Sequence, residues 1–286
     1  MSLTIRTAAN SLVDVAWLRD HLAAPDVRVV DASWHLPADG RDARREFDDG
    51  HIPGAVFFDI DDISDDRSAL PHMMPPMEKF VSRIRKLGLG DGHRIVIYDA
   101  AGLFSAARVW WTFRYFGHPD VAVLDGGLPA WRASGGPLDD MPPAPRERHF
   151  TPRVRSMLVK DVTEVAEALK LDTAQVVDAR SPARFAGQEP EPRPDVRPGR
   201  MPGAKNVHYR TLLDDAGAMK PLEELAAAFE AAGVDLTRPI ITTCGSGVTA
   251  AILNLALERI GHRDHALYDG SWAEWGSGEM LPVEAG

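Results

Sequence analysis

The single cysteine of the chain, Cys244, lies between a β-branched apolar run at 240–243 and a helical pattern at 250–257. The first segment predicts a strand and the second a helix, with a loop of small residues between them. A thiol in such a loop faces free backbone N–H groups and the positive end of the helix dipole, which favour the nucleophilic thiolate. A lone cysteine is more often simply packed in the core. Because Gly245 and Gly247 allow a ligand to approach the backbone closely, we predict that Cys244 is a nucleophile.

The bulk properties of the chain restrict its function. Its 286 residues suit two domains of about 140 residues. One cysteine excludes a disulfide framework, and the ten histidines show no paired ligand spacing, so we expect no metal and no cofactor. The formal net charge of −10 argues against nucleic acid as a partner. We see no membrane span and no signal core, and therefore expect a reducing, cytoplasmic location.

The sequence contains an internal repeat. Four short blocks recur in the same order about 145 residues apart. The matching positions include Asp31 and Asp178, Gly54 and Gly203, Asp99 and Cys244, and Asp125 and Asp269. We infer a tandem duplication that forms two domains, residues 1–138 and 159–286, joined by a proline-rich polar linker at 139–158.

Short apolar runs alternate with helical patterns in each copy. In the first copy, 27–31 and 94–98 read as strands, and 77–87 reads as a helix that Gly88 ends. Its counterpart in the second copy is a helix at 222–232. This alternation predicts an α/β fold in which each domain is a mainly parallel sheet flanked by helices. Ligands gather at the carboxyl ends of such strands, which is where Cys244 falls.

The two copies differ at this position. The first has Asp99 where the second has Cys244, and the residues that follow, 100–105, include no comparable nucleophile. We therefore predict one catalytic copy and one supporting copy.

Three motifs together resemble the two-domain rhodanese (sulfurtransferase) family: Cys-x-x-Gly-Val-Thr at 244–249, Gly-His-Ile-Pro-Gly-Ala at 50–55 and Asp-Gly-Ser-Trp-x-Glu-Trp at 269–275. The resemblance covers essentially the whole chain, although 199–202 departs from the usual His-Ile-Pro. It implies two rhodanese-like domains. The loop is similar to the type that uses 3-mercaptopyruvate, because the thiosulfate-using type typically has charged residues where this chain has Gly245 and Ser246.

The resemblance also implies roles for particular residues. Arg184 and Arg193 would hold the donor carboxylate, which suits the planar guanidinium fork. A Ser246–His72–Asp61 relay would reach from the first copy to the second. The other loop residues, Gly245, Gly247, Val248 and Thr249, would line the substrate site. For Arg197 and Arg200 we expect ordinary surface charges.

The reaction implied is transfer of a sulfane sulfur from 3-mercaptopyruvate through a Cys244 persulfide, with release of pyruvate. The expected partners are a small anionic sulfur donor and a thiophilic acceptor, namely cyanide, a small thiol or a thioredoxin-like protein. Two alternatives stay open: a thiosulfate sulfurtransferase, and a persulfide carrier that serves a protein partner. A cysteine phosphatase is disfavoured because its Cys-x5-Arg loop would need arginine at Ala250. A nucleotide P-loop is disfavoured because no Gly-Lys-Ser/Thr follows the glycines.

Overall fold

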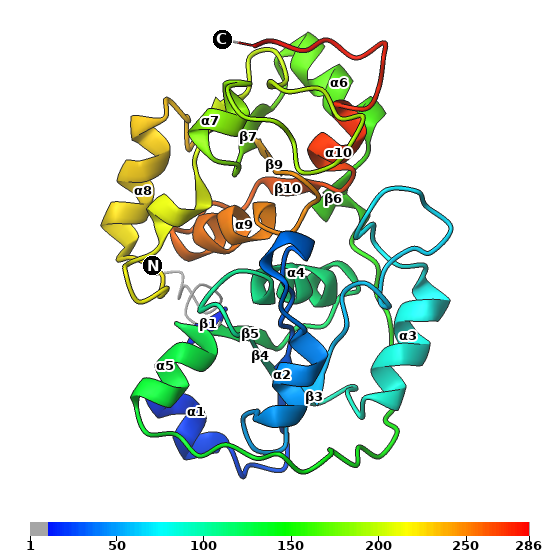
Figure 1. The fold of residues 1–286 in the computed structure, drawn as a ribbon, viewed down its shortest axis with the longest axis vertical. Coiled ribbons are helices and arrows are strands. Elements are labelled where there is room, and N and C mark those ends of the chain that lie inside the picture. The colour runs from blue at the N-terminus through cyan, green and yellow to red at the C-terminus, as the bar shows by residue number, and fades with distance from the viewer. Residues whose placement is uncertain (1–10, 286) are drawn as a thin grey trace, which may run out of the picture. The chain divides into compact units, whose positions relative to one another are not determined.

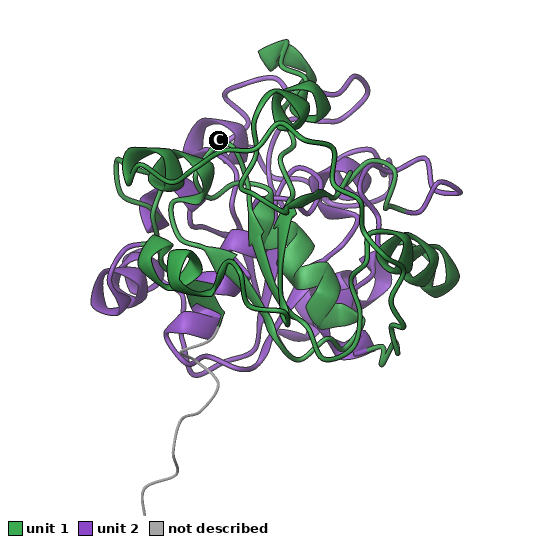
Figure 2. Cartoon of the chain, turned by 90° about the horizontal axis from the view of Figure 1, so that it is seen from below, with its two compact units in different colours: residues 1–64, 75–154, 213–219 green, residues 65–74, 155–212, 220–286 purple. Residues whose placement is uncertain are grey.

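The computed structural model describes residues 11–285. The chain forms two compact units, each built around one sheet (Figure 1). The first unit contains residues 11–64, 75–154 and 213–219, and the second contains residues 65–74, 155–212 and 220–285 (Figure 2).

Both sheets have five parallel strands in the same order. The first sheet, in the order β1-β5-β4-β2-β3, consists of β1 (Leu12–Val13), β2 (Val27–Asp31), β3 (Val56–Phe57), β4 (Arg94–Tyr98) and β5 (Val121–Leu124). The second, in the order β6-β10-β9-β7-β8, consists of β6 (Val159–Lys160), β7 (Gln175–Asp178), β8 (Lys205–Asn206), β9 (Ile240–Thr243) and β10 (His265–Tyr268). The predicted duplication and α/β fold class are confirmed.

Five α-helices accompany each sheet in the described part of the chain. The first unit has α1 (Val15–His21), α2 (Ala43–Asp49), α3 (Met77–Lys86), α4 (Ala106–Tyr115) and α5 (Gly127–Ala133). The second has α6 (Val162–Leu171), α7 (Pro182–Phe185), α8 (Leu222–Ala231), α9 (Ala250–Arg259) and α10 (Ser271–Trp275). Short 3-10 turns lie at Pro37–Asp39, Ser156–Leu158 and Tyr209–Leu212. Between residues 11 and 285, no helix combines the length and the apolar character needed to cross a membrane.

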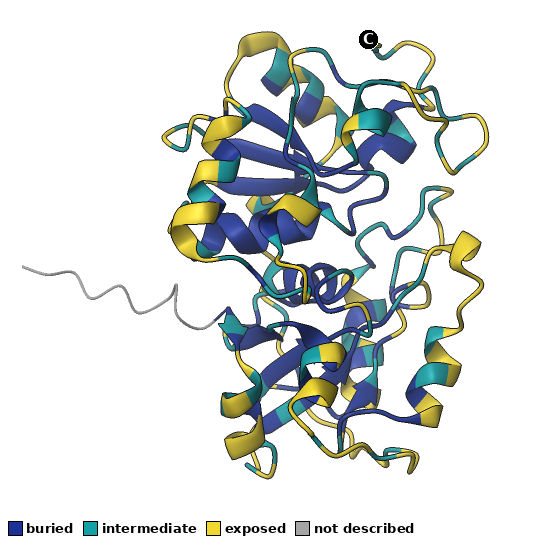
Figure 3. Cartoon of the chain, turned by 60° about the vertical axis from the view of Figure 1, so that its left-hand side comes forward, coloured by how far each residue is buried: buried dark blue, intermediate teal, exposed yellow. Residues whose placement is uncertain are grey.

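Local sequence signals explain where these elements begin and end. The central strands β4 and β9 are rich in β-branched residues and are buried on both faces (Figure 3). Helix α6 begins with a capping box, in which Asp161 accepts from the Glu164 N–H at 2.9 Å and Glu164 accepts from the Asp161 N–H at 3.1 Å. Helix α3 ends just before Gly88, which has φ 71° and so takes the left-handed conformation that terminates a helix.

Strand register brings the carboxyl ends of neighbouring strands together. In the first sheet Asp31 of β2 pairs with Tyr98 of β4, and in the second Asp178 of β7 pairs with Thr243 of β9. Cys244 therefore leaves the sheet beside Asp178, as expected for a site at the carboxyl edge of a parallel sheet.

Each unit also contains a short segment from the other half of the sequence. Residues 65–74 belong to the second unit, where the Met74 N–H donates to Asp269 Oδ2 at 2.6 Å. Residues 213–219 belong to the first unit, where the Met219 N–H donates to Asp125 Oδ1 at 2.8 Å. Asp125 and Asp269 are matching positions of the repeat, so the two units use the same anchor for the exchanged segment.

The stretch 139–158 is mostly exposed, but part of it packs on the first unit. Phe150 is buried there, with its ring centroid 5.5 Å from that of Phe80 and 6.4 Å from that of Phe113.

Candidate active site

The loop that follows β9 is fixed to the start of α10. The carbonyl oxygens of Cys244 and Gly245 accept from the N–H groups of Trp272 and Ala273, both at 2.9 Å. The Cys244 N–H donates to Ser271 Oγ at 3.3 Å. Cys244 has a free thiol and is 2% exposed, while Gly245 and Thr249, which follow it in the loop, are half-buried. Hydrogen bonds thus anchor the backbone of Cys244, and the residue next to it, Gly245, is partly exposed to solvent.

The backbone N–H groups of this loop are available to a ligand. Within residues 11–285, the N–H groups of 245–249 donate no hydrogen bond to another part of the protein. Gly247 has φ 78°, a conformation that favours glycine and allows the loop to curl. Unpaired amides ahead of a helix form a ready site for an anion.

The matching loop of the first unit has its amides occupied. Asp99 Oδ2 accepts from the N–H groups of Phe104, Ser105 and Ala106 at 2.7, 2.9 and 2.9 Å. Its Oδ1 accepts from the Ala101 N–H at 2.9 Å. A fixed carboxylate therefore takes the anion position of the first loop, whereas the second loop has a cysteine at that place and keeps its amides free.

Arg184 lies directly against the cysteine loop. A Cβ atom at Gly245 would come within 3.2 Å of Arg184 Nη2, so the absence of a side chain lets the guanidinium approach. Arg184 is on α7, whose first turn is capped by Ser181, the side chain of which accepts from the Arg184 N–H at 3.3 Å. The arginine side chain is 23% exposed. It can therefore reach a ligand at the loop from the solvent side.

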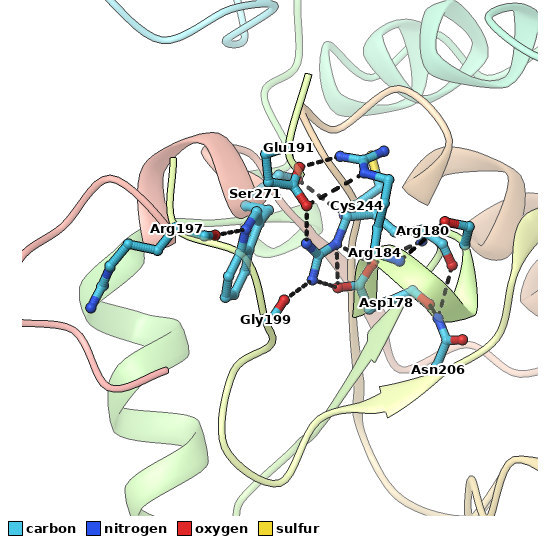
Figure 4. Close-up of polar contacts among 11 residues, drawn as sticks. Asp178, Arg180, Arg184, Glu191, Arg197, Gly199, Asn206, Cys244 and Ser271 are labelled. Carbon is cyan, nitrogen blue, oxygen red and sulfur yellow. Dashed lines mark hydrogen bonds and ion pairs between the residues drawn. The ribbon is translucent and has the colours of Figure 1, made fainter. Parts of the chain in front are cut away.

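A buried ionic network supports Arg184 (Figure 4). Glu191, with a side chain only 3% exposed, forms an ion pair with Arg184 Nη2 and accepts from Arg180 Nη1 at 2.8 Å. Arg180 Nη2 also donates to Asp178 Oδ2 at 2.7 Å and to the Gly199 carbonyl at 2.8 Å. Burial lowers the pKa of Arg180, but Asp178 and Glu191 outweigh it, and the net shift is upward. Two carboxylates and two guanidiniums thus balance in charge and fix Arg184 next to Gly245.

His72 and Ser246 meet in the second unit. His72 Nδ1 lies 3.1 Å from Ser246 Oγ, and both residues are buried. His72 has φ 60°, a left-handed conformation that is uncommon outside glycine and is often retained at functional sites. The segment 65–74 that carries it is held to the same unit by the Met74–Asp269 hydrogen bond.

The remaining residues considered in the sequence analysis, one aspartate and three arginines, lie outside the cysteine loop. Asp61 belongs to the first unit, where its Oδ2 accepts from Trp34 Nε1 at 3.1 Å. Arg193 is half-buried in the loop after α7. The expectation that Arg197 is an ordinary surface charge is wrong, because it donates to the carbonyls of Gly276 and Leu281 at 3.0 and 2.9 Å and ties the C-terminal segment down. Arg200 is half-buried and 3.5 Å from Glu284.

Arg180 and Glu191 were not foreseen from the sequence. Glu191 lies in an acidic, proline-rich loop that has no periodicity, so nothing in the sequence distinguishes it from a solvated charge. Arg180 follows Asp178 by two residues at a strand end, and this Asp-x-Arg spacing is the one signal that could have suggested a buried pair.

Comparisons with known proteins identify the family of the chain. Residues 14–134 and 161–277 each match the rhodanese-like domain. The chain is 44% identical to the 3-mercaptopyruvate sulfurtransferase of Homo sapiens, over 93% of this chain and 92% of that protein. It is 40% identical to the thiosulfate/3-mercaptopyruvate sulfurtransferase 1 of Arabidopsis thaliana, over 98% of this chain and 79% of that protein. The crystal structure of SseA from Escherichia coli, a 3-mercaptopyruvate sulfotransferase by its description, superposes with a TM-score of 0.85 at 40% identity, covering 91% of this chain and 98% of that one.

Proposed function

The chain belongs to the rhodanese family and is a sulfurtransferase of the 3-mercaptopyruvate type, and from this premise we propose that Cys244 carries the sulfur as a persulfide. The observation that supports the proposal is the pairing of a lone cysteine with a loop of unoccupied amides. Sulfur bound to Cys244 as an anion would receive hydrogen bonds from these amides, in the manner of an oxyanion hole.

The proposed reaction has two steps. The Cys244 thiolate attacks the thiol sulfur of 3-mercaptopyruvate, an S–S bond forms, and the carbon–sulfur bond breaks. Its electron pair leaves as the pyruvate enolate, which takes one proton to become pyruvate. In the second step cyanide or a thiolate attacks the outer sulfur, and Cys244 leaves as the thiolate, ready for another cycle. No external oxidant or reductant is consumed.

We assign binding of the donor carboxylate to Arg184, and we propose that Arg193 contributes a second positive charge. Arg184 is the charged side chain that lies against Gly245, and Glu191 sets its direction. A guanidinium–carboxylate pair also offsets the repulsion between an anionic donor and a chain of net charge −10. The loop residues Gly245, Gly247, Val248 and Thr249 would surround the reacting sulfur.

We assign protonation of the leaving enolate to Ser246, which His72 orients at 3.1 Å. A buried histidine in a left-handed conformation, bonded to a loop hydroxyl, is a costly arrangement that a purely structural contact would not need. The part of Asp61 in this relay stays a prediction.

The experiment that tests the function compares kcat/KM for 3-mercaptopyruvate and for thiosulfate, with cyanide as acceptor. We expect a clear preference for 3-mercaptopyruvate and, after exposure to the donor alone, a protein mass increased by one sulfur atom. Cys244→Ser should lose both the activity and the mass increase while keeping the thermal midpoint. Full activity in that variant would contradict the mechanism.

Thiosulfate is the second candidate donor. The Arabidopsis thaliana relative is named for both donors, and Arg184 could pair with the charged oxygens of thiosulfate as well as with a carboxylate. A higher kcat/KM for thiosulfate than for 3-mercaptopyruvate would favour this candidate.

We also propose a cytoplasmic location and a low-molecular-weight thiol or a thioredoxin-like protein as acceptor. The support is chemical, because a cysteine that must cycle through its free thiolate is maintained in reducing compartments. Fractionation of cells that express the protein, followed by acceptor screening on the isolated persulfide, would test both points.

A further inference from the structure

The first unit contains a cavity at the carboxyl end of β2. Its volume is about 500 Å³, within the usual range of small-molecule sites. The walls include Asp31, Ser33, Asp49, Ala100, Leu128 and Arg132, all residues of the first unit. The cavity is separate from the cysteine loop, which belongs to the second unit.

The repeat identifies what this cavity corresponds to. The positions that match Asp31, Ser33 and Leu128 in the second unit are Asp178, Arg180 and Trp272. There, Arg180 donates to Asp178 from Nε at 2.9 Å and from Nη2 at 2.7 Å. The guanidinium carbon of Arg180 also lies 4.3 Å from the centroid of the Trp272 ring. In the second unit this space is thus filled by a guanidinium between a carboxylate and an apolar wall.

The first unit keeps the carboxylate and the wall but lacks the cation. Ser33 stands at the position of Arg180, and Leu128 at that of Trp272. Asp31 is 2% exposed and accepts from the Ser33 N–H at 2.8 Å. Among residues 11–285, no arginine or lysine forms an ion pair with Asp31. Asp31 therefore lines the cavity as a buried carboxylate that, unlike Asp178, has no cationic partner in the described part of the chain.

The other charged residues of the cavity are consistent with a ligand that carries a guanidinium. Arg41 is engaged by Glu46, to which its Nε and Nη2 donate at 2.7 Å each. Asp49 forms an ion pair with Arg45 at 3.9 Å. Among the described residues that line the cavity, Arg132, exposed at the end of α5, is then the cation left to oppose Asp31. Burial raises the pKa of Asp31, against hydrogen bonds from Ser33 and Tyr98, as expected for a buried carboxylate without a cation.

We propose that this cavity binds a small guanidino acid, whose guanidinium pairs with Asp31 in the place that Arg180 takes in the second unit and whose carboxylate faces Arg132. The planar guanidinium matches a carboxylate bidentately, and its flat face can rest on Leu128. The first unit, which has Asp99 at the position of Cys244, is thereby a ligand-binding unit.

The test is a titration of the whole protein, followed by NMR of the Ser33 and Ala100 backbone amides and by calorimetry. The probes are methylguanidinium and guanidinoacetate, with tetramethylammonium chloride at the same ionic strength as the control. We expect saturable shifts with both guanidino probes and none with tetramethylammonium. Guanidinoacetate should bind about ten-fold more tightly than methylguanidinium because it also pairs with Arg132.

Three variants separate the contributions of the open guanidinium position, of Asp31 and of Arg132 to binding. Ser33→Arg supplies the missing guanidinium from the chain itself, so in the folded protein it should abolish binding of both probes. Because the Ser33 hydroxyl accepts from the Ala100 N–H at 2.9 Å, the thermal midpoint of this variant is measured first to establish that it is folded. Asp31→Asn should weaken both probes at least about ten-fold, and Arg132→Gln should remove only the advantage of guanidinoacetate. No saturable shift in the wild type, equal binding of tetramethylammonium, or unchanged binding in a folded Ser33→Arg protein would overturn the proposal.

Discussion

Replacing Glu191 by glutamine tests the idea that a buried ionic network positions Arg184. The substitution keeps the shape of the side chain but removes the charge that both Arg180 and Arg184 contact. The cluster with Asp178 then changes from electrically balanced to a net charge of about +1, in a place where the Arg180 and Glu191 side chains are 1% and 3% exposed. Breaking a buried pair in this way costs about 3–5 kcal/mol.

We take the lower end, about 3 kcal/mol, because Arg184 is partly exposed and Arg180 keeps its bonds to Asp178. For a chain of this length that loss lowers the thermal midpoint by about 6–12 °C. Arg184 also loses its fixed direction toward Gly245, so KM for 3-mercaptopyruvate should rise about ten-fold, equivalent to about 1.4 kcal/mol, with kcat nearly unchanged.

The matched control is Glu189→Gln, which removes the same charge from an exposed position of the same loop. It should change stability by no more than about 0.5 kcal/mol and leave KM unchanged. Thermal unfolding and steady-state kinetics of the two variants measure both effects. If Glu191→Gln behaves like Glu189→Gln, the network does not position Arg184. If its KM falls instead, Glu191 competes with the donor for Arg184 rather than orienting it.

Three further predictions concern the first unit. Asp99→Asn replaces the Oδ2 acceptor of three backbone N–H groups. The free energy of unfolding, measured by urea titration, should therefore drop by about 3 kcal/mol. An unchanged value would mean that these amides find other acceptors. Gly127→Ala should lower the free energy of unfolding far more than Gly54→Ala. Both glycines have positive φ, but only at Gly127 would a Cβ collide with carbonyl oxygens, at 2.5 and 2.6 Å. Equal losses in the two variants would refute this. Burial lowers the pKa of His118 below 6.5, so the unfolded chain binds more protons and stability should decline as pH falls from 6.5 through the lowered pKa. His118→Gln should make that decline of stability with falling pH shallower. An unchanged slope of stability against pH would exclude His118 as its cause.

The parts of the structure that the sequence predicted are those set by local patterns. The strands β2, β4 and β9 and the helices α3, α8 and α9 follow from short-range periodicity and from glycine stops, and the repeat predicted their duplication. The cysteine loop was predictable for the same reason, because it lies directly between a strand and a helix.

The missed features depend on segments that meet only in the folded chain. Glu191 becomes a buried acceptor because the loop after α7 folds back onto Arg180, and no periodicity records that path. The carbonyl contacts of Arg197 depend likewise on residues about eighty positions further along. The meeting of His72 with Ser246 was proposed from family resemblance and not from local pattern, since 174 positions separate them.

The exchange of residues 65–74 and 213–219 has a consequence for the inheritance of this protein. The two repeats arose from one ancestral segment, yet neither half of the present gene encodes a complete unit. A recombination event that joined this second half to a foreign first half would discard His72 and Met74 together. Selection is therefore expected to act on the two halves as a linked pair, so that phylogenetic trees built from each half separately should share the same branching order.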